Sequence, residues 1–263
     1  MDLPIKEIAS ICALIVVCMV RMAAALSIAP FFSRQFVVGT SRNVVIFALC
    51  MPLFLHLIPT LPQGDVALLT MGAILIKEAV IGIVLGFVTS FIFYAAEGVG
   101  FIIDVQRGAS MATIFDPMAG SQTSLMGSFL IQMMSVAFFS AGGFLFFLSL
   151  MYKTYQLWPV FTYFPTFQTG FAVFFNDFLN QLMAVIFCLS APILIVLFLS
   201  EFGLGLVNRF APQLNVFFLA MPIKSWVSML FLLMYMPCLG YFFEKYFTVE
   251  SKLLEFINVF LVP

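Results

Sequence analysis

Long apolar stretches separated by short polar links run along the chain and predict helices that cross a membrane. A helix of about 20 apolar residues spans a bilayer, so each stretch is long enough for about one crossing. The stretch 66–103 is too long for one straight span, which predicts one very long helix or a bent pair. The expected fold class is therefore an all-α membrane protein with about six hydrophobic helices. These predicted helices lie at 8–32, 44–61, 66–103, 125–152, 178–199 and 226–243.

The composition supports this class of protein. Hydrophobic residues make up 63% of the chain and charged residues only 9%, whereas soluble domains carry about 25% charged residues. The 35 phenylalanines supply bulky apolar surface that suits contact with lipid or packing between membrane subunits. The net charge of -1 argues against nucleic acid as a partner. The lipid bilayer is the expected environment.

One segment, 200–225, places charged, amide and proline residues inside otherwise apolar sequence: SEFGLGLVNRFAPQLNVFFLAMPIKS. Each of Glu201, Arg209 and Lys224 would cost about 2.5 to 3.5 kcal/mol at a bilayer centre, so protein or water must surround them. Eight residues separate Glu201 from Arg209, which is about 12 Å along a helix axis. We therefore expect each charge to bond to another helix or subunit. The candidate polar contacts within the membrane or between subunits are Glu97, Glu201, Asn208, Arg209, Pro212, Gln213, Asn215 and Lys224.

A second polar segment, 104–124, lies between two strongly apolar stretches. It contains Gly108, Pro117 and Gly120, which interrupt helices, and we expect a loop or a partly re-entrant segment. Within a bilayer such a backbone is tolerated only when it is buried in protein or lines water. Two interpretations remain open, a solvated surface loop and a gate or plug across a pore.

Small residues and the remaining links complete the organisation. Gly82 and Gly86 form a GxxxG pair that would let two helices approach closely. The link 153–177 mixes aromatic residues with proline, which is typical of chain at a membrane interface, and is the best candidate boundary between two halves. The tail 244–263 alternates charged and apolar residues at helical spacing, which predicts an amphipathic helix at a surface or against a partner.

The sequence contains no motif that indicates an enzyme. The motifs of zinc proteases, serine hydrolases and nucleotide-binding loops are absent. No two cysteines have the spacing of a metal or redox pair, and the single histidine lacks partners, so we expect no metal and no cofactor. Two non-catalytic classes remain. One is a proton- or ion-coupled secondary transporter with Glu97, Glu201 and Arg209 as coupling residues. The other is a structural subunit of a larger conducting assembly.

The two polar segments also resemble a known family. The segment 200–225 looks like the signature of the FliR/SctT family, the export-gate proteins of flagellar and type III secretion systems, and IIDVQRGASMATIFDP looks like its central loop. The resemblance extends over nearly the whole chain, including KEAVIGIVLGF at 77–87 and the Arg21 and Pro30 features of the first helix. Ser200 with Glu201, PIKS at 222–225 and the segment 104–108 resemble the injectisome branch more than the flagellar one. The resemblance therefore favours a virulence-type or host-association secretion system.

The resemblance implies a specific architecture. Members of the family look like a fusion of two partner subunits, here an R-type half at 1–170 and an S-type helical hairpin at 171–263, and their helices are arranged as hairpins. The loop 104–124 would be the plug of the closed channel, with apolar sealing candidates at Met111, Ile114, Phe115 and Met118. The candidate residues of this loop are Asp104, Gln106, Arg107, Gly108, Met111, Ile114, Phe115, Asp116, Pro117 and Met118.

The resemblance also implies a location and a set of partners. The protein would be a non-enzymatic, multi-pass subunit of the bacterial inner membrane within the basal body of the secretion system. It would close a helical ring of R-type and S-type export-gate subunits. The other expected partners are the U-type export switch protein, the export-gate ring protein and the unfolded secreted proteins that pass through the channel.

Overall fold

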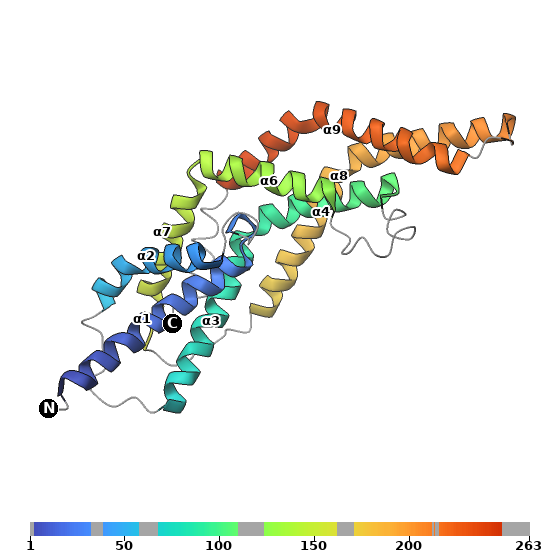
Figure 1. Cartoon of the computed structure of the whole chain (residues 1–263). Coiled ribbons are helices and arrows are strands. Elements are labelled where there is room, and N and C mark those ends of the chain that lie inside the picture. Colours follow the sequence, from blue (N-terminus) through green and yellow to red (C-terminus); the bar gives the residue numbers. More distant parts are fainter. Residues whose placement is uncertain are drawn as a thin grey trace. The chain divides into compact units, whose positions relative to one another are not determined.

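The computed structural model describes residues 3–32, 39–57, 68–109, 124–161, 171–211, 213 and 216–248. These residues form eight α-helices and one short 3-10 helix (Figure 1). The elements are α1 (Leu3–Ile28), η1 (Pro30–Phe32), α2 (Gly39–Leu57), α3 (Leu68–Thr89), α4 (Phe91–Arg107), α6 (Leu125–Ser140), α7 (Gly143–Leu157), α8 (Phe171–Phe210) and α9 (Val216–Thr248). The prediction of an all-helical protein is confirmed, but the expected number of about six helices is too low.

Two of the predicted helices are each a pair of helices. The stretch 66–103 forms two helices, α3 and α4, separated by Ser90, and not the single very long helix that was the other expectation. The stretch 125–152 was expected to form one helix, and this was wrong, because the chain breaks between α6 and α7. Gly142 has a φ of 77° at this break, a left-handed conformation that glycine adopts at little cost.

The polar segment 200–225 consists mainly of the ends of two long helices. α8 continues past Glu201 and Arg209 to Phe210, and α9 begins at Val216. The two helices are joined by a short connection, of which Ala211 and Gln213 are described. Proline lies inside both helices, at Pro192 in α8 and at Pro222 and Pro237 in α9.

The structure also moves two expected boundaries. Residues 244–248 continue α9, so the tail predicted for 244–263 does not begin as a separate helix, and its remainder lies outside the described residues. The interfacial link predicted for 153–177 is shorter than expected. α7 extends to Leu157 and α8 begins at Phe171.

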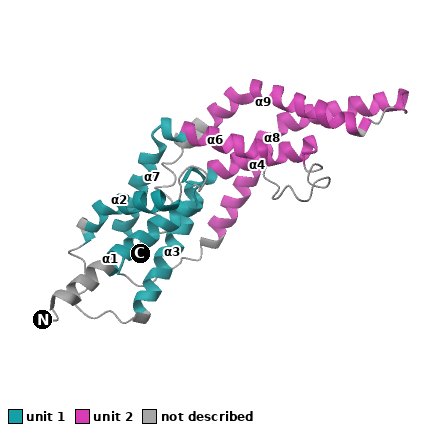
Figure 2. Ribbon diagram, viewed as in Figure 1, with its two compact units in different colours: residues 1–91, 138–171, 251–263 teal, residues 92–137, 172–250 magenta. Residues whose placement is uncertain are grey.

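The chain divides into two compact units (Figure 2). Unit 1 comprises the described residues of 1–91 and 138–171, and unit 2 those of 92–137 and 172–250. Unit 1 packs α1 against α3 and α2 around buried side chains such as Leu14, Met22, Leu26 and Ile46. Phe31 of η1 stacks on Phe138, with ring centroids 4.8 Å apart, and meets Phe147 edge to face. The buried side chains of unit 2 include Phe93, Ile103, Leu130, Met134, Ile193 and Leu197.

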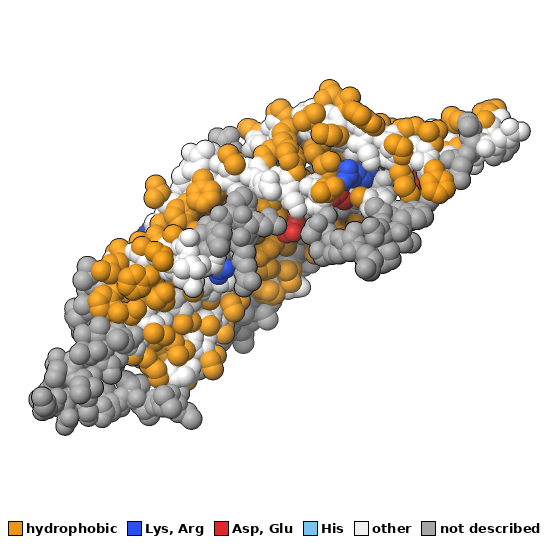
Figure 3. Space-filling view, in the orientation of Figure 1, with side chains coloured by type: hydrophobic (Ala, Val, Ile, Leu, Met, Phe, Trp, Pro, Cys, Tyr) orange, Lys and Arg blue, Asp and Glu red, His pale blue; other side chains and the backbone are white. Residues whose placement is uncertain are grey.

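Among the residues that the structure describes, three helical segments are long and apolar enough to cross a membrane, judged by length and composition. They are Thr70–Thr89, Val173–Phe210 and Phe218–Phe242, and the bent pair of α6 and α7 would make a fourth. Large apolar side chains cover much of the described surface on the face in Figure 3, and charged side chains appear there at only a few points. On α8 and α9 the exposed apolar residues include Phe198, Phe202, Phe210, Phe218, Trp226, Leu230 and Met234. Such surfaces require lipid or partner subunits to cover them.

Candidate functional site

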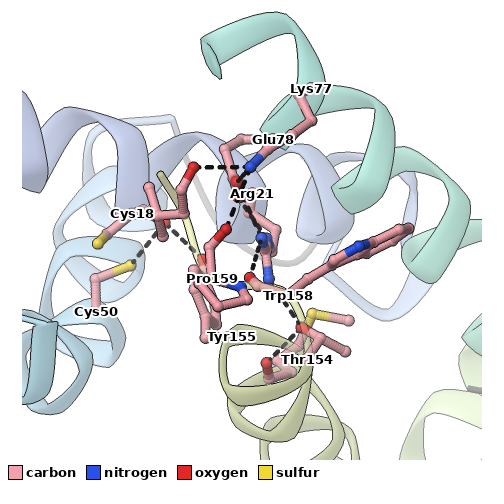
Figure 4. Close-up of polar contacts among 11 residues, drawn as sticks. Cys18, Arg21, Cys50, Lys77, Glu78, Thr154, Tyr155, Trp158 and Pro159 are labelled. Atoms are coloured by element: carbon pink, nitrogen blue, oxygen red, sulfur yellow. Dashed lines mark hydrogen bonds and ion pairs between the residues drawn. The ribbon is translucent and has the colours of Figure 1, made fainter. Parts of the chain in front are cut away.

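Unit 1 contains a buried ionic cluster that joins α1, α3 and the end of α7. Arg21 has no solvent exposure, and its Nε and Nη2 donate to the two carboxylate oxygens of Glu78 at 2.5 and 2.9 Å. Lys77 Nζ lies 3.1 Å from Glu78 Oε1. The two cations therefore share one buried anion (Figure 4).

The same cations bind backbone carbonyls just beyond the last residue of α7. Arg21 Nη2 donates to the Trp158 carbonyl at 3.1 Å, and Lys77 Nζ donates to the Val160 carbonyl at 2.7 Å. The Arg21 guanidinium also lies 4.1 Å from the centroid of the Tyr155 ring, a favourable cation–π contact. Because a helix C-terminus carries partial negative charge, cations at this position stabilise it. The cluster therefore fixes where the chain leaves α7.

Gly82 and Gly86 lie on the side of α3 that faces α1. A Cβ added at Gly86 would lie 2.5 Å from the Ala25 carbonyl oxygen, and one at Gly82 would overlap the Arg21 carbonyl and approach Ala24. Backbone contact this close is possible only for glycine. The close approach sets the spacing of α1 and α3 beside the ionic cluster.

In unit 2 the first residues of the expected 104–124 loop are helical. Asp104, Gln106 and Arg107 form the last turn of α4, so the prediction of a loop from Asp104 onward is wrong for its first four residues. Asp104 is buried and binds Ser124, at the other end of the segment, at 2.7 Å. Gly108 follows the helix with a φ of 88°. The sealing candidates Met111, Ile114, Phe115 and Met118, together with Asp116 and Pro117, lie outside the described residues.

Glu201 and Lys224 meet across the two long helices of unit 2. Lys224 Nζ lies 2.9 Å from Glu201 Oε2, which links α8 to α9. The Lys224 side chain is 10% exposed, whereas that of Glu201 is 55% exposed. An ion pair with one partner this exposed contributes little to stability. The pair shows that α8 and α9 lie side by side at these two residues.

Three of the other predicted polar residues of unit 2 lie at the end of α8 or just after it, and Glu97 lies on α4. Glu97, Asn208, Arg209 and Gln213 are exposed, and among the described residues no ion pair to Arg209 is found. Pro212 and Asn215 lie outside the described residues. Gly203 and Gly205 lie on α8 with no atom within 4 Å of an added Cβ. This end of α8 is therefore open to another chain.

The described residues hold no group of three potential metal ligands from His, Cys, Asp and Glu. The ionic cluster of unit 1 was missed as a site. Arg21, Lys77 and Glu78 are visible in the sequence as charges inside apolar helices, which was the available signal. Nothing in one sequence pairs Arg21 with Glu78 across 57 positions.

Comparison with known proteins gives a consistent result. The family described as "Bacterial export proteins, family 1" matches residues 12–249. The chain is 40% identical over 216 residues to Yop proteins translocation protein T of Yersinia pestis, with 82% of each chain covered. It is 32% identical to surface presentation of antigens protein SpaR of Salmonella typhimurium, over 82% of this chain and 80% of the relative. It is 34% identical to flagellar biosynthetic protein FliR of Bacillus subtilis, over 68% of each.

Proposed function

The chain belongs to the FliR/SctT family of bacterial export proteins, and we propose that it closes a ring of partner subunits and helps to form and seal a channel for unfolded secreted proteins. The family is one of multi-pass inner-membrane proteins of the type III export apparatus, and its members are structural rather than catalytic. Identity is higher to the Yersinia translocation protein than to the flagellar relative, 40% against 34%. The proposal therefore places this chain in a virulence-type secretion system.

One observation carries the proposal, which is the family match over nearly the whole chain. Two features of the described residues support it. The long helices α8 and α9 leave large apolar side chains exposed, and the charged and amide side chains at the end of α8 are exposed as well. A surface that mixes apolar and charged groups suits neighbouring protein helices better than lipid alone, because charges facing lipid are costly.

The proposed partners are those that the family resemblance implies. They are the R-type and S-type membrane subunits, the U-type export switch protein and the ring protein of the gate. We further propose that the chain is a fusion of an R-type half at 1–170 and an S-type hairpin at 171–263. The contact of Glu201 on α8 with Lys224 on α9 supports the second half as a hairpin, since a short connection joins these two long apolar helices.

The proposed plug, the segment 104–124, can be tested directly by deleting part of it. Deleting Met111–Met118 is expected to raise the leak of small ions several-fold through the resting complex, because the deletion removes the apolar residues proposed to seal the channel. The leak is measured as dye-reported loss of membrane potential in cells that make the complete export apparatus. Complex recovery must match the wild type.

A matched control removes apolar side chains elsewhere. Met51 is exposed on α2, away from α8 and α9 in the sequence, and the variant Met51→Ala should leave the resting leak unchanged. A deletion that assembles normally and leaks no more than the wild type would rule out the plug. Export-apparatus membership rests on the family match and would stand.

A further inference from the structure

Asp104 lies in the last turn of α4, and its backbone carbonyl accepts one of the hydrogen bonds that terminate this helix. Gly108, with its φ of 88°, donates its N–H to the Val105 carbonyl at 3.1 Å, and Ala109 donates to the Asp104 carbonyl at 3.0 Å. These two bonds make the Schellman motif that commonly terminates helices at a glycine. The main chain therefore leaves α4 in a defined direction.

The side chain of Asp104 binds the start of α6. Asp104 Oδ2 accepts one hydrogen bond from Ser124 Oγ at 2.7 Å and another from the Met126 N–H at 3.0 Å. Ser124 Oγ in turn accepts a hydrogen bond from the Gly127 N–H at 2.8 Å, so Ser124 is the N-cap of α6. Together the carboxylate and the hydroxyl satisfy two free N–H groups of the first turn. Negative charge is favourable there because of the helix dipole.

Two further features hold this arrangement in place. Arg107, one turn after Asp104, brings its Nε within 2.8 Å of Asp104 Oδ1, and only 12% and 8% of the two side chains are exposed. Gly100 of α4 meets the backbone of Gly127 so closely that an added Cβ would overlap it. The two helices are therefore in backbone contact just beside the hydrogen bonds of Asp104, which leaves the joint little freedom to open.

We propose that Asp104 is a positioning residue, which clasps the end of α4 to the start of α6 and fixes both points from which the intervening segment departs. This inference rests on the proposed plug function of that segment. It adds that the joint of α4 and α6 stays closed during export. The carboxylate acts through Ser124 and the Met126 amide.

The test compares variants of the assembled complex by hydrogen–deuterium exchange and by resting ion leak. Asp104→Ala should accelerate exchange in the first turn of α6, at Met126 and Gly127, and should raise the leak toward that of the Met111–Met118 deletion. Asp104→Asn keeps an acceptor oxygen for both bonds but removes the charge that pairs with Arg107, and it should fall between the wild type and Asp104→Ala in both measurements. Rescue by asparagine would distinguish lost hydrogen bonds from lost charge.

Two matched variants complete the design. Asp177→Ala removes an exposed carboxylate of α8 and should change neither measurement. Ser124→Ala removes one bond to Asp104 and the cap of Gly127, and should reproduce a smaller version of both effects. If Asp104→Ala is not recovered in the complex, exchange and leak are measured on Ser124→Ala instead.

Three outcomes would overturn the proposal, and each is distinguishable from failure of the plug. Unchanged exchange in both Asp104→Ala and Ser124→Ala would contradict the clasp itself, whatever the leak. Faster exchange without a leak, while the Met111–Met118 deletion leaks, would contradict the positioning role and leave the plug intact. If neither the deletion nor Asp104→Ala leaks, the plug fails and the positioning role fails with it.

Discussion

Replacing Glu78 with alanine should remove most of the folded protein from the membrane. The change removes the buried carboxylate that both Arg21 and Lys77 bind. Breaking a buried ion pair by removing one partner costs about 3–5 kcal/mol, which is a large part of the stability of an ordinary domain. The measurement is the amount of chain in isolated membranes, together with the thermal stability of the detergent-solubilised complex.

A variant of the neighbouring residue, Lys77, tests whether any substitution at this point of α3 would destabilise the protein as much. Lys77→Met keeps an unbranched side chain of similar length and leaves the bidentate pair of Arg21 with Glu78 intact. We expect a smaller loss, because the main cost is the unpaired Val160 carbonyl that Lys77 now binds. Equal stability of Glu78→Ala and the wild type would contradict the account of this cluster. If Lys77→Met and Glu78→Ala lowered the stability equally, the ion pair of Glu78 with Arg21 would contribute no more than the contacts of Lys77.

Replacing Arg209 with alanine should prevent recovery of the chain with its partner subunits. Arg209 lies in the last turn of α8, is exposed, and has no ion pair among the described residues. If a neighbouring subunit supplies the acidic partner, truncation costs about 2–5 kcal/mol at that interface. The measurement is the yield of the partners after affinity purification of the tagged chain.

The control for Arg209 is another exposed cation. Lys153 lies on α7 and is exposed, so Lys153→Ala should give wild-type recovery. Arg209→Lys should recover part of the complex, because it keeps the charge but not the planar fork of the guanidinium. Normal recovery of Arg209→Ala with lost secretion would contradict an assembly role and would instead support a role in conduction.

Periodicity and length predicted most of the helices. The excess length of 66–103 allowed either one very long helix or two helices, and the structure has two, with a break between Thr89 and Phe91. The break between α6 and α7 was harder to predict, because a Gly142–Gly143 pair inside apolar sequence is common and hydropathy does not change there. The last helical turn of α4, at Asp104, was also missed. The polar composition that begins at Asp104 suggested a loop there, whereas the helix continues until Gly108 ends it.

The sequence predicted which charges inside apolar sequence need a polar partner, but not which residue each partner is. The cost of charge in an apolar environment predicted that Glu201 and Lys224 would bond to another helix, and the structure pairs them with each other across α8 and α9. Asp104 carried a similar signal, but its binding to Ser124 depends on how α4 and α6 pack, since backbone contact at Gly100 and Gly127 brings them together. A single sequence records no such long-range packing.

The central claim is that this chain is one subunit of an export gate, and native mass spectrometry of the mildly solubilised complex tests it most directly. The expected result is one large assembly that contains this chain with two other small, hydrophobic subunits, each present in several copies. Recovery as a lone monomer or a symmetric dimer would contradict the claim. That result would favour a secondary transporter with Glu97 and Glu201 as its coupling residues.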